Sequence, residues 1–173
     1  MQIILGIVII VILLLIIAAV LPKTAKIQVE TTINASKAQV RDYVSKIKNQ
    51  ENYSVRVMAD PSAKPSYTGT DGTVWFIAAR DSQMKNVGKG AQEIIKIEEW
   101  TSYEVELRFE RPMKATNYAQ TILEDLWNNQ TKVSNTFQWS TPRPFNLMSI
   151  FFMPKLRNDM QKNLDNLKVI IEK

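Results

Sequence analysis

The sequence predicts an α+β protein in which a curved antiparallel sheet wraps around a long C-terminal helix, with a single transmembrane helix before it. Three observations predict this. Residues 3–21 contain no charged side chain, residues 91–139 hold several strand-like segments, and apolar residues recur every three or four positions from Leu156 to Ile171. An antiparallel sheet with one apolar face must cover that face, and the C-terminal helix carries a matching apolar stripe.

The apolar N-terminal segment has the length of a membrane span. Its 19 residues, Ile3 to Leu21, would extend about 28 Å as a helix, close to the hydrocarbon thickness of a bilayer. Pro22 then ends the helix, and Lys23 favours the polar interface. We expect residues 1–22 to form a transmembrane anchor and residues 23–173 to form one domain.

A cleaved signal peptide is the alternative interpretation of this segment. Such a peptide needs a basic start and a shorter apolar core, whereas Met1 and Gln2 carry no side-chain charge. The small residues at 18–20 nevertheless resemble a cleavage site, so the alternative stays open. Lys23 and Lys26 follow the span and no basic residue precedes it, which predicts a single-pass membrane protein with its domain in the cytoplasm.

Composition excludes several classes of function. The chain has 173 residues, a net charge of +5, no cysteine and no histidine. It therefore lacks disulfides, cysteine or histidine metal ligands and a Ser-His-Asp triad. The basic residues are scattered among acids rather than gathered in a stripe, so nucleic acid is not an expected partner. We expect no metal and no cofactor, and any catalysis would fall to Asp, Glu, Lys, Tyr or Arg.

The first half of the domain reads as a strand, a helix and a loop. Polar and apolar residues alternate over 25–33, which predicts a half-buried strand. Ser36 and Gln39 then have the spacing of a capping box, and a helix is expected over 37–48. Residues 59–72 are dense in Pro, Ser, Gly and Asp, which favours a surface loop.

The second half reads as strands followed by one helix. The continuous apolar run Thr73–Ala79 predicts a central strand, and further strands are expected over 91–99, 103–109, 115–124 and 131–139. From Pro154 the period becomes helical, and Pro suits a first helical turn. This order predicts the sheet-around-helix architecture.

Five segments of the chain resemble a known superfamily. They are INASKAQVRDYVSKIKNQENYS, GTVWFIAARDSQMKNVGKGAQEIIKIE, LRFERPMKATNYAQTILE, NQTKVSNTFQW and MPKLRNDMQKNLDNLKVIIE, within about residues 25–172. Their order and spacing resemble the START-like or SRPBCC proteins of the helix-grip fold, and within them the polyketide cyclase/dehydrase-like branch. The chain departs from the pattern where Tyr53 stands alone in a region that often holds Trp, and where Asn135 replaces a Trp.

The resemblance implies a ligand cavity between the concave sheet face and the C-terminal helix. It implies binding of a hydrophobic or amphipathic small molecule, such as a lipid, rather than a particular reaction. The expected lining residues are Tyr103, Val105, Leu107, Phe109, Val133, Phe137, Met153, Leu156 and Met160. The alternative is a solid-cored protein-interaction domain, which would hold no cavity above about 300 Å³, the lower end for ligand pockets.

Polar residues of the predicted strands supply further candidates. Asn135 has the parity of Val133 and Phe137, so its buried amide would bond a ligand head, Tyr118 or a water. Glu93 shares parity with Ile95 and Ile97, which predicts an inward carboxylate that Arg80 could pair. A cyclase- or dehydratase-like enzyme would use Glu93, Tyr103 or Tyr118 for proton transfer.

An apolar block, PFNLMSIFFMP, precedes the C-terminal helix at residues 144–154. Three interpretations are open for it: a flap over the cavity, a segment that dips into the bilayer, and the start of the helix itself.

Overall fold

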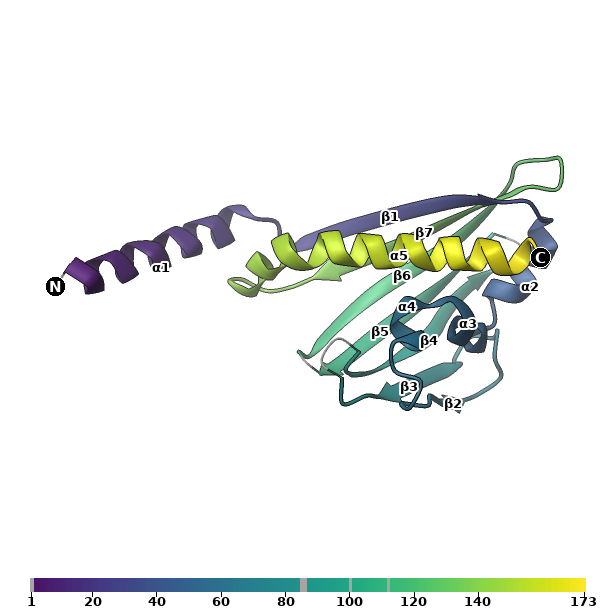
Figure 1. Cartoon of the computed structure of the whole chain (residues 1–173), viewed down its shortest axis with the longest axis horizontal. Helices are drawn as coiled ribbons and strands as arrows, with labels where there is room; N and C mark the ends of the chain where they lie inside the picture. Colours follow the sequence, from purple (N-terminus) through teal and green to yellow (C-terminus); the bar gives the residue numbers. More distant parts are fainter. Residues whose placement is uncertain (1, 85–86, 100, 112) are drawn as a thin grey trace.

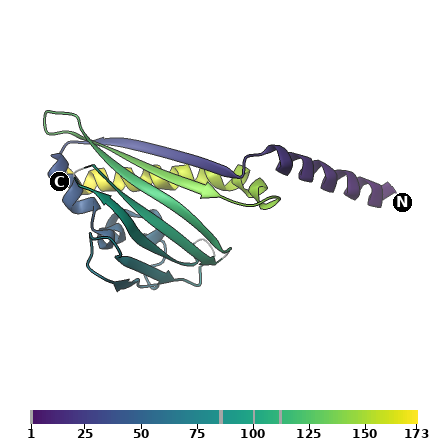
Figure 2. The same cartoon turned by 180° about the vertical axis from the view of Figure 1, so that it is seen from behind.

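The structure, a computed structural model, describes residues 2–84, 87–99, 101–111 and 113–173. A seven-stranded sheet in these residues curves around the long helix α5 (Ser149–Ile171), and helix α1 (Gln2–Val20) projects from one end (Figure 1). The antiparallel order is β1-β7-β6-β5-β4-β3-β2. Figure 2 gives the reverse view, with the strands in front of α5. The bounds are β1 Thr24–Ile33, β2 Ser66–Thr68, β3 Ile77–Asp81, β4 Lys89–Glu98, β5 Ser102–Arg111, β6 Ala115–Asp125 and β7 Thr131–Ser140.

Helix α1 is long and apolar enough to cross a membrane. It covers the expected span Ile3–Leu21 except Leu21, which follows its last residue. Met1, part of the expected anchor, lies outside the described residues. Its side chains are exposed apart from Ala18, which contacts the domain. An apolar helix of this kind buries its surface in lipid or in a partner, because water solvates it poorly.

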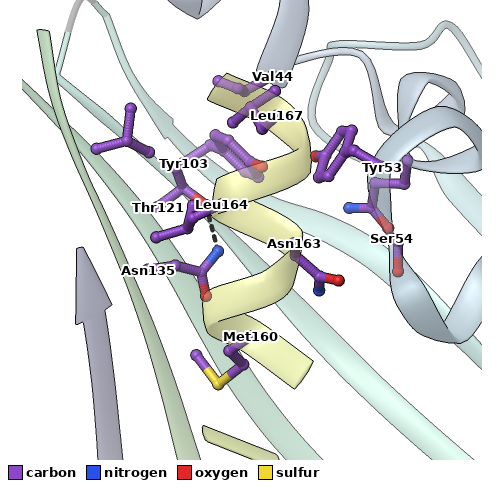
Figure 3. A pocket seen from close by; sticks show the side chains of 12 residues that line it. Val44, Tyr53, Ser54, Tyr103, Thr121, Asn135, Met160, Asn163, Leu164 and Leu167 are labelled. Atoms are coloured by element: carbon purple, nitrogen blue, oxygen red, sulfur yellow. Dashed lines mark hydrogen bonds between the residues drawn. The ribbon is translucent and has the colours of Figure 1, made fainter. Parts of the chain in front are cut away.

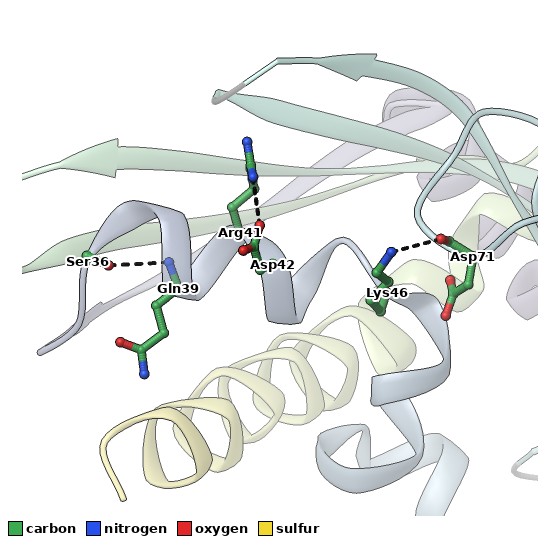
Figure 4. Close-up of polar contacts among 6 residues, drawn as sticks. All are labelled: Ser36, Gln39, Arg41, Asp42, Lys46 and Asp71. Atoms are coloured by element: carbon green, nitrogen blue, oxygen red, sulfur yellow. Dashed lines mark hydrogen bonds and ion pairs between the residues drawn. The ribbon is translucent and has the colours of Figure 1, made fainter.

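Three short α-helices and one 3-10 helix follow β1 in the described residues. The hydroxyl of Ser36 accepts a bond from the backbone N–H of Gln39 at 3.3 Å, which starts α2 (Lys37–Val44) as expected (Figure 4). The expected helix to residue 48 is too long, because a 3-10 helix replaces it at Ile47–Asn49. The Asp71 carboxylate accepts the N–H of Ile47 at 2.8 Å and so caps this turn from a distant loop. Helices α3 (Gln50–Tyr53) and α4 (Val55–Met58) come next.

The region of residues 59–81 differs from the prediction in two ways. Strand β2 lies inside the expected loop, and the run expected as a central strand becomes β3, second from the sheet edge. Strand β3 begins only at Ile77, because Trp75 has a φ of 74° that extended backbone does not allow. Its indole is 74% exposed, so the apolar run is not one buried strand.

Strands β5 and β7 follow the expected alternation, whereas β4 does not. In β5, Tyr103 and Val105 are buried on the concave face. In β4, the facing residues are Gln92, opposite Leu107, and Ile94, opposite Val105. A bulge after Ile94 inserts one residue and changes which side chains face inward.

Helix α5 lays its apolar stripe across the sheet, with Met160, Leu164, Leu167 and Ile171 buried. It begins at Ser149, five residues before the expected start. Pro154 lies within the helix and is exposed, so it removes one helical hydrogen bond without a clash in the core. The apolar block thus forms a 3-10 helix at Phe145–Met148 and the first turn of α5.

The beginning of this block also contacts α1. The side-chain amide of Asn146 donates to the carbonyl oxygens of Ala18 at 2.8 Å and Leu21 at 3.0 Å. The guanidinium of Arg143 donates to Ala18 at 3.0 Å and also to Ala19. These are carbonyls at the C-terminal end of a helix, which have no helical partner of their own. The contacts hold the end of α1 against the start of the C-terminal segment.

Candidate ligand-binding cavity

A cavity of about 650 Å³ lies between the concave face of the sheet and helices α4 and α5. Its volume falls within the range of roughly 300–1,000 Å³ that is usual for small-molecule sites. It exceeds the limit that a solid-cored domain predicts. Its apolar wall consists mainly of Val57, Tyr67, Ala78, Leu107, Phe109, Phe137, Trp139, Met148, Phe152, Leu156 and Met160.

Small residues on β3 and β4 leave the space open. Ala78, Ala79, Gly88 and Gly90 line this side of the cavity and project little or no side chain into it. Gly90 is also required by the close approach of β5, since a Cβ there would lie 2.5 Å from the backbone oxygen of Arg108. The strand pairing that shapes the cavity therefore depends on glycine at this position.

A second, smaller cavity of about 90 Å³ lies beside the first (Figure 3). We call it the inner chamber. Gln50, Ser54, Met160 and Asn163 line both cavities, so the two are neighbours with a common wall. The other lining residues of the inner chamber are Val44, Tyr53, Tyr103, Thr121, Val133, Asn135, Leu164 and Leu167.

Polar groups of the inner chamber lie close to one another. The Asn135 amide donates to the Thr121 hydroxyl at 3.2 Å (Figure 3). The phenols of Tyr103 and Tyr53 line the same chamber. Burial raises the pKa of Tyr53 and of Tyr103 above the ordinary phenol value. Both phenols are therefore neutral at physiological pH and able to donate hydrogen bonds.

Charged groups lie around the larger cavity instead. Arg56 places its guanidinium carbon 5.2 Å from the centre of the Phe109 ring, a cation–π distance. Burial lowers the pKa of Arg56, and the nearby Asp159 carboxylate opposes that shift. Arg80 donates to the Val57 carbonyl at 2.5 Å and so ties α4 to β3. The charged lining residues are Glu51, Arg56, Arg80, Lys89, Arg108, Lys155 and Asp159.

Most of the residues expected at a cavity lie at one. Leu107, Phe109, Phe137 and Leu156 line the larger cavity, and Met160 lines both. Tyr103, Val133 and Asn135 line the inner chamber, where the partner of the Asn135 amide is Thr121. Val105 is buried in the core and Met153 packs against that core, and neither is among the lining residues.

Glu93 and Tyr118 lie on the outer face of the sheet, contrary to the expectation. Glu93 accepts a bond from Arg108 at 2.6 Å, so the expected pairing with Arg80 is wrong. Tyr118 is 44% exposed and donates to Glu106 at 3.4 Å. The bulge after Ile94 explains the error for Glu93, because parity counted back from Ile97 crosses an inserted residue. Of the three residues considered for proton transfer, Tyr103 alone lies at a cavity.

Sequence reasoning missed Trp139 and Arg56, among other wall residues. Trp139 has the parity of Asn135 and Phe137, so strand alternation could have found it. Its ring meets Phe152 edge-on, with centroids 5.6 Å apart. Arg56 carried no comparable signal, because α4 is one turn long. Phe152 was expected only as part of the apolar block, for which a flap over the cavity was one of three interpretations.

Among the described residues, no group of three His, Cys, Asp or Glu side chains is placed to hold a metal ion.

The curved sheet, the gripped C-terminal helix and the cavity between them define a helix-grip protein. The sequence family described as "Polyketide cyclase / dehydrase and lipid transport" matches residues 24–172. The chain belongs to that family, and its fold is one that binds hydrophobic ligands. The comparison with curated proteins found no match.

Solved structures share the fold at low sequence identity. Norcoclaurine synthase from Thalictrum flavum aligns with a TM-score of 0.65 at 12% identity, over 86% of this chain and 93% of that one. Another structure of that enzyme holds dopamine and hydroxybenzaldehyde. Ara h 8.0201 aligns with a TM-score of 0.61 at 13% identity, over 86% and 97% of the two chains. Aha1 from Colwellia psychrerythraea aligns at 0.58 and 15% identity, over 86% and 96%.

Proposed function

We propose that this protein binds a hydrophobic or amphipathic small molecule, such as a lipid, in the 650 Å³ cavity while α1 anchors it in a membrane. The observation that carries the proposal is the apolar wall of a cavity large enough for such a ligand. Burial of the apolar part would supply the affinity, at about 25 cal/mol for each Å² removed from water. A few polar groups would fix the orientation of the ligand.

The exposed part of the cavity wall supports a link with the bilayer. Met148 and Phe152 line the cavity, are 53% and 42% exposed and belong to the apolar block, so we take them to be the mouth of the cavity. In the same block Phe145, Ile150 and Phe151 are 55%, 51% and 83% exposed. Exposed aromatic and aliphatic side chains of this kind are typical of membrane-contacting surfaces.

The position of this block relative to α1 makes the argument specific. Arg143 and Asn146 bond the last turn of α1, so the exposed side chains lie beside the end of the proposed anchor. An anchored domain would therefore present Phe151 and Ile150 to the lipid headgroups. A membrane-dissolved ligand would reach the cavity past Met148 and Phe152 without crossing water.

The direct test is native mass spectrometry of the full-length protein solubilised in detergent. We expect a co-purified small molecule, or one loaded from a lipid extract, bound with a 1:1 stoichiometry. If carefully prepared samples carry no ligand and none can be loaded, the binding proposal fails.

The anchor needs a separate test. Leu13→Arg together with Leu14→Arg should release the protein from membranes, since each central arginine costs about 2.5–3.5 kcal/mol on insertion. The paired control is Leu13→Ala with Leu14→Ala, which should stay membrane-bound through alkaline extraction. An intact mass that lacks the first 19 or so residues would instead identify a cleaved signal peptide.

We also propose that the domain faces the cytoplasm, on the basis of Lys23 and Lys26 after the span. The chain has no cysteine, so one introduced thiol reports on topology without background. Lys64 is exposed, and Lys64→Cys should resist a membrane-impermeant maleimide until the cells are opened. Labelling of intact cells would place the domain on the outside.

A further inference from the structure

The inner chamber differs in chemistry from the cavity beside it. Its lining includes the phenols of Tyr53 and Tyr103, the hydroxyl of Thr121 and the amides of Asn135 and Asn163. No charged side chain lines this chamber among the described residues, whereas seven charged residues line the larger cavity. The interior is therefore divided into a neutral polar end and an apolar region edged by charges.

We propose that the inner chamber is the subsite for an uncharged hydrogen-bonding group, a hydroxyl or a carbonyl, at the buried end of the ligand. The proposal rests on the proposed function and narrows its ligand class to neutral amphiphiles that bind with the polar end inward. The apolar part would lie along Leu107, Phe109 and Phe137. The far end of the ligand would point to Phe152 at the mouth.

The size of the inner chamber supports a small polar group. At about 90 Å³ it is roughly three times the volume that one water occupies in the liquid, about 30 Å³. A hydroxyl or a ketone can enter and replace the hydrogen bonds of a displaced water.

The electrostatics favour a neutral group over an ion. Transfer of an unpaired carboxylate or ammonium into a dry site is strongly unfavourable, and the lining offers no counter-charge. Tyr103 and Thr121 are 8% and 4% exposed, so an ion placed beside them would lose most of its hydration. Hydroxyl and carbonyl groups need only donors and acceptors, which Asn135, Thr121 and the two phenols provide.

A ligand that occupies both spaces has to cross the wall that they share. Met160 belongs to this wall, because it lines both cavities, and Figure 3 shows it among the lining residues of the inner chamber. Its unbranched thioether side chain adapts to different shapes at low cost. Asn163 is fixed in the same wall, because its side-chain oxygen accepts the N–H of Val55 at 2.8 Å. The Met160 side chain is therefore the part of the wall that would move to admit a ligand.

Photo-crosslinking tests the orientation. The full-length protein in nanodiscs is loaded with 1-hexadecanol that carries a diazirine near the hydroxyl, or with the isomer that carries it at the chain end. The head-labelled probe should crosslink to residues 53, 103, 121, 135 or 160–164, and the tail-labelled probe to residues 109, 148 or 152. The reverse pattern, or head crosslinks at the mouth alone, would overturn the inference and leave ligand binding intact.

Affinity measurements test the chemistry of the subsite. Thr121→Val and Asn135→Leu keep the shape but remove hydrogen-bonding groups, so 1-hexadecanol should bind about 2- to 12-fold more weakly for each lost bond. Binding of 1-chlorohexadecane, a weak acceptor of similar length, should not fall. Tyr118→Phe on the outer face is the control and should leave both affinities unchanged.

The outcomes separate the two proposals. If neither compound binds the unmodified protein, the proposed function fails. If both bind but the variants weaken them equally, or weaken neither, the cavity is a binding site and the inner chamber is not its polar subsite.

Discussion

Helix α5 packs into a filled core at one end of the domain interior and forms a wall of the cavity at the other end. Near its C-terminal end, α5 contributes Ile171 to a packed core that also holds Ile33 and Val40, and none of these three residues lines either cavity. Near its N-terminal end, the same helix forms one wall of the cavity, where Leu156 is half-buried. Leu156 and Ile171 lie fifteen residues apart on one stripe, or about 22 Å along the axis. The residues that stabilise the fold and those that line the cavity therefore lie at opposite ends of one helix.

The largest effect should come from truncation in the filled half. Ile171→Ala would leave a cavity among packed side chains and should lower the free energy of unfolding by about 2–5 kcal/mol. Leu156→Ala removes the same number of carbon atoms from a wall that already lacks neighbours on one side, so about 1 kcal/mol is expected. Urea unfolding of the full-length protein in detergent, followed by tryptophan fluorescence, measures both. Equal losses would contradict the division into a filled and a hollow half.

An intermediate effect should follow from filling the hollow half. Leu107→Trp adds bulk inside the cavity and should weaken ligand binding at least tenfold, about 1.4 kcal/mol, with little change in stability. Tyr118→Trp adds bulk to the outer face of the next strand and is the matched control. Titration with the co-purified ligand measures both variants. Unchanged affinity in Leu107→Trp would place the ligand elsewhere.

The smallest effect should be on the free energy of unfolding at alkaline pH, through Tyr103 in the inner chamber. Burial raises the folded-state pKa of Tyr103, so its contribution to stability is complete below its unfolded value near pH 10. That contribution is lost as the pH rises from there through the folded-state pKa, at about 1.4 kcal/mol per pH unit. Tyr103→Phe should make the alkaline loss of stability shallower, as measured by urea unfolding between pH 9 and 11. The exposed Tyr118 supplies the control, Tyr118→Phe, and an equal slope in all three proteins would contradict this reasoning.

The sequence predicted the elements whose apolar pattern is continuous. The alternation in β5, the Ser36 cap and the stripe from Leu156 to Ile171 each depend on local spacing, and the structure confirms all three. The fold could therefore be predicted once these elements were assembled into a sheet and its covering helix.

The cavity could be predicted only in outline. Parity placed Leu107, Phe109 and Phe137 on the concave face, because the register is continuous around these residues in β5 and β7. Parity gave the wrong face for Glu93, because a bulge inserts one residue after Ile94. The positive φ of Trp75 also delays the start of β3 to Ile77. The volume of the cavity could not be predicted from the sequence, because it depends on how far α4 and α5 lie from the sheet.

The bonds from Arg143 and Asn146 to the end of α1 have a consequence for synthesis of the chain. The donors follow their acceptor Ala18 by 125 and 128 residues, so the last turn of α1 emerges long before the side chains that complete it. At about 5–20 residues per second, that interval lasts roughly 6 to 25 s. During this time the carbonyls of Ala18 and Leu21 must be solvated by water or by lipid headgroups. Docking of the end of α1 against Arg143 and Asn146 is thus one of the last steps in the folding of the chain.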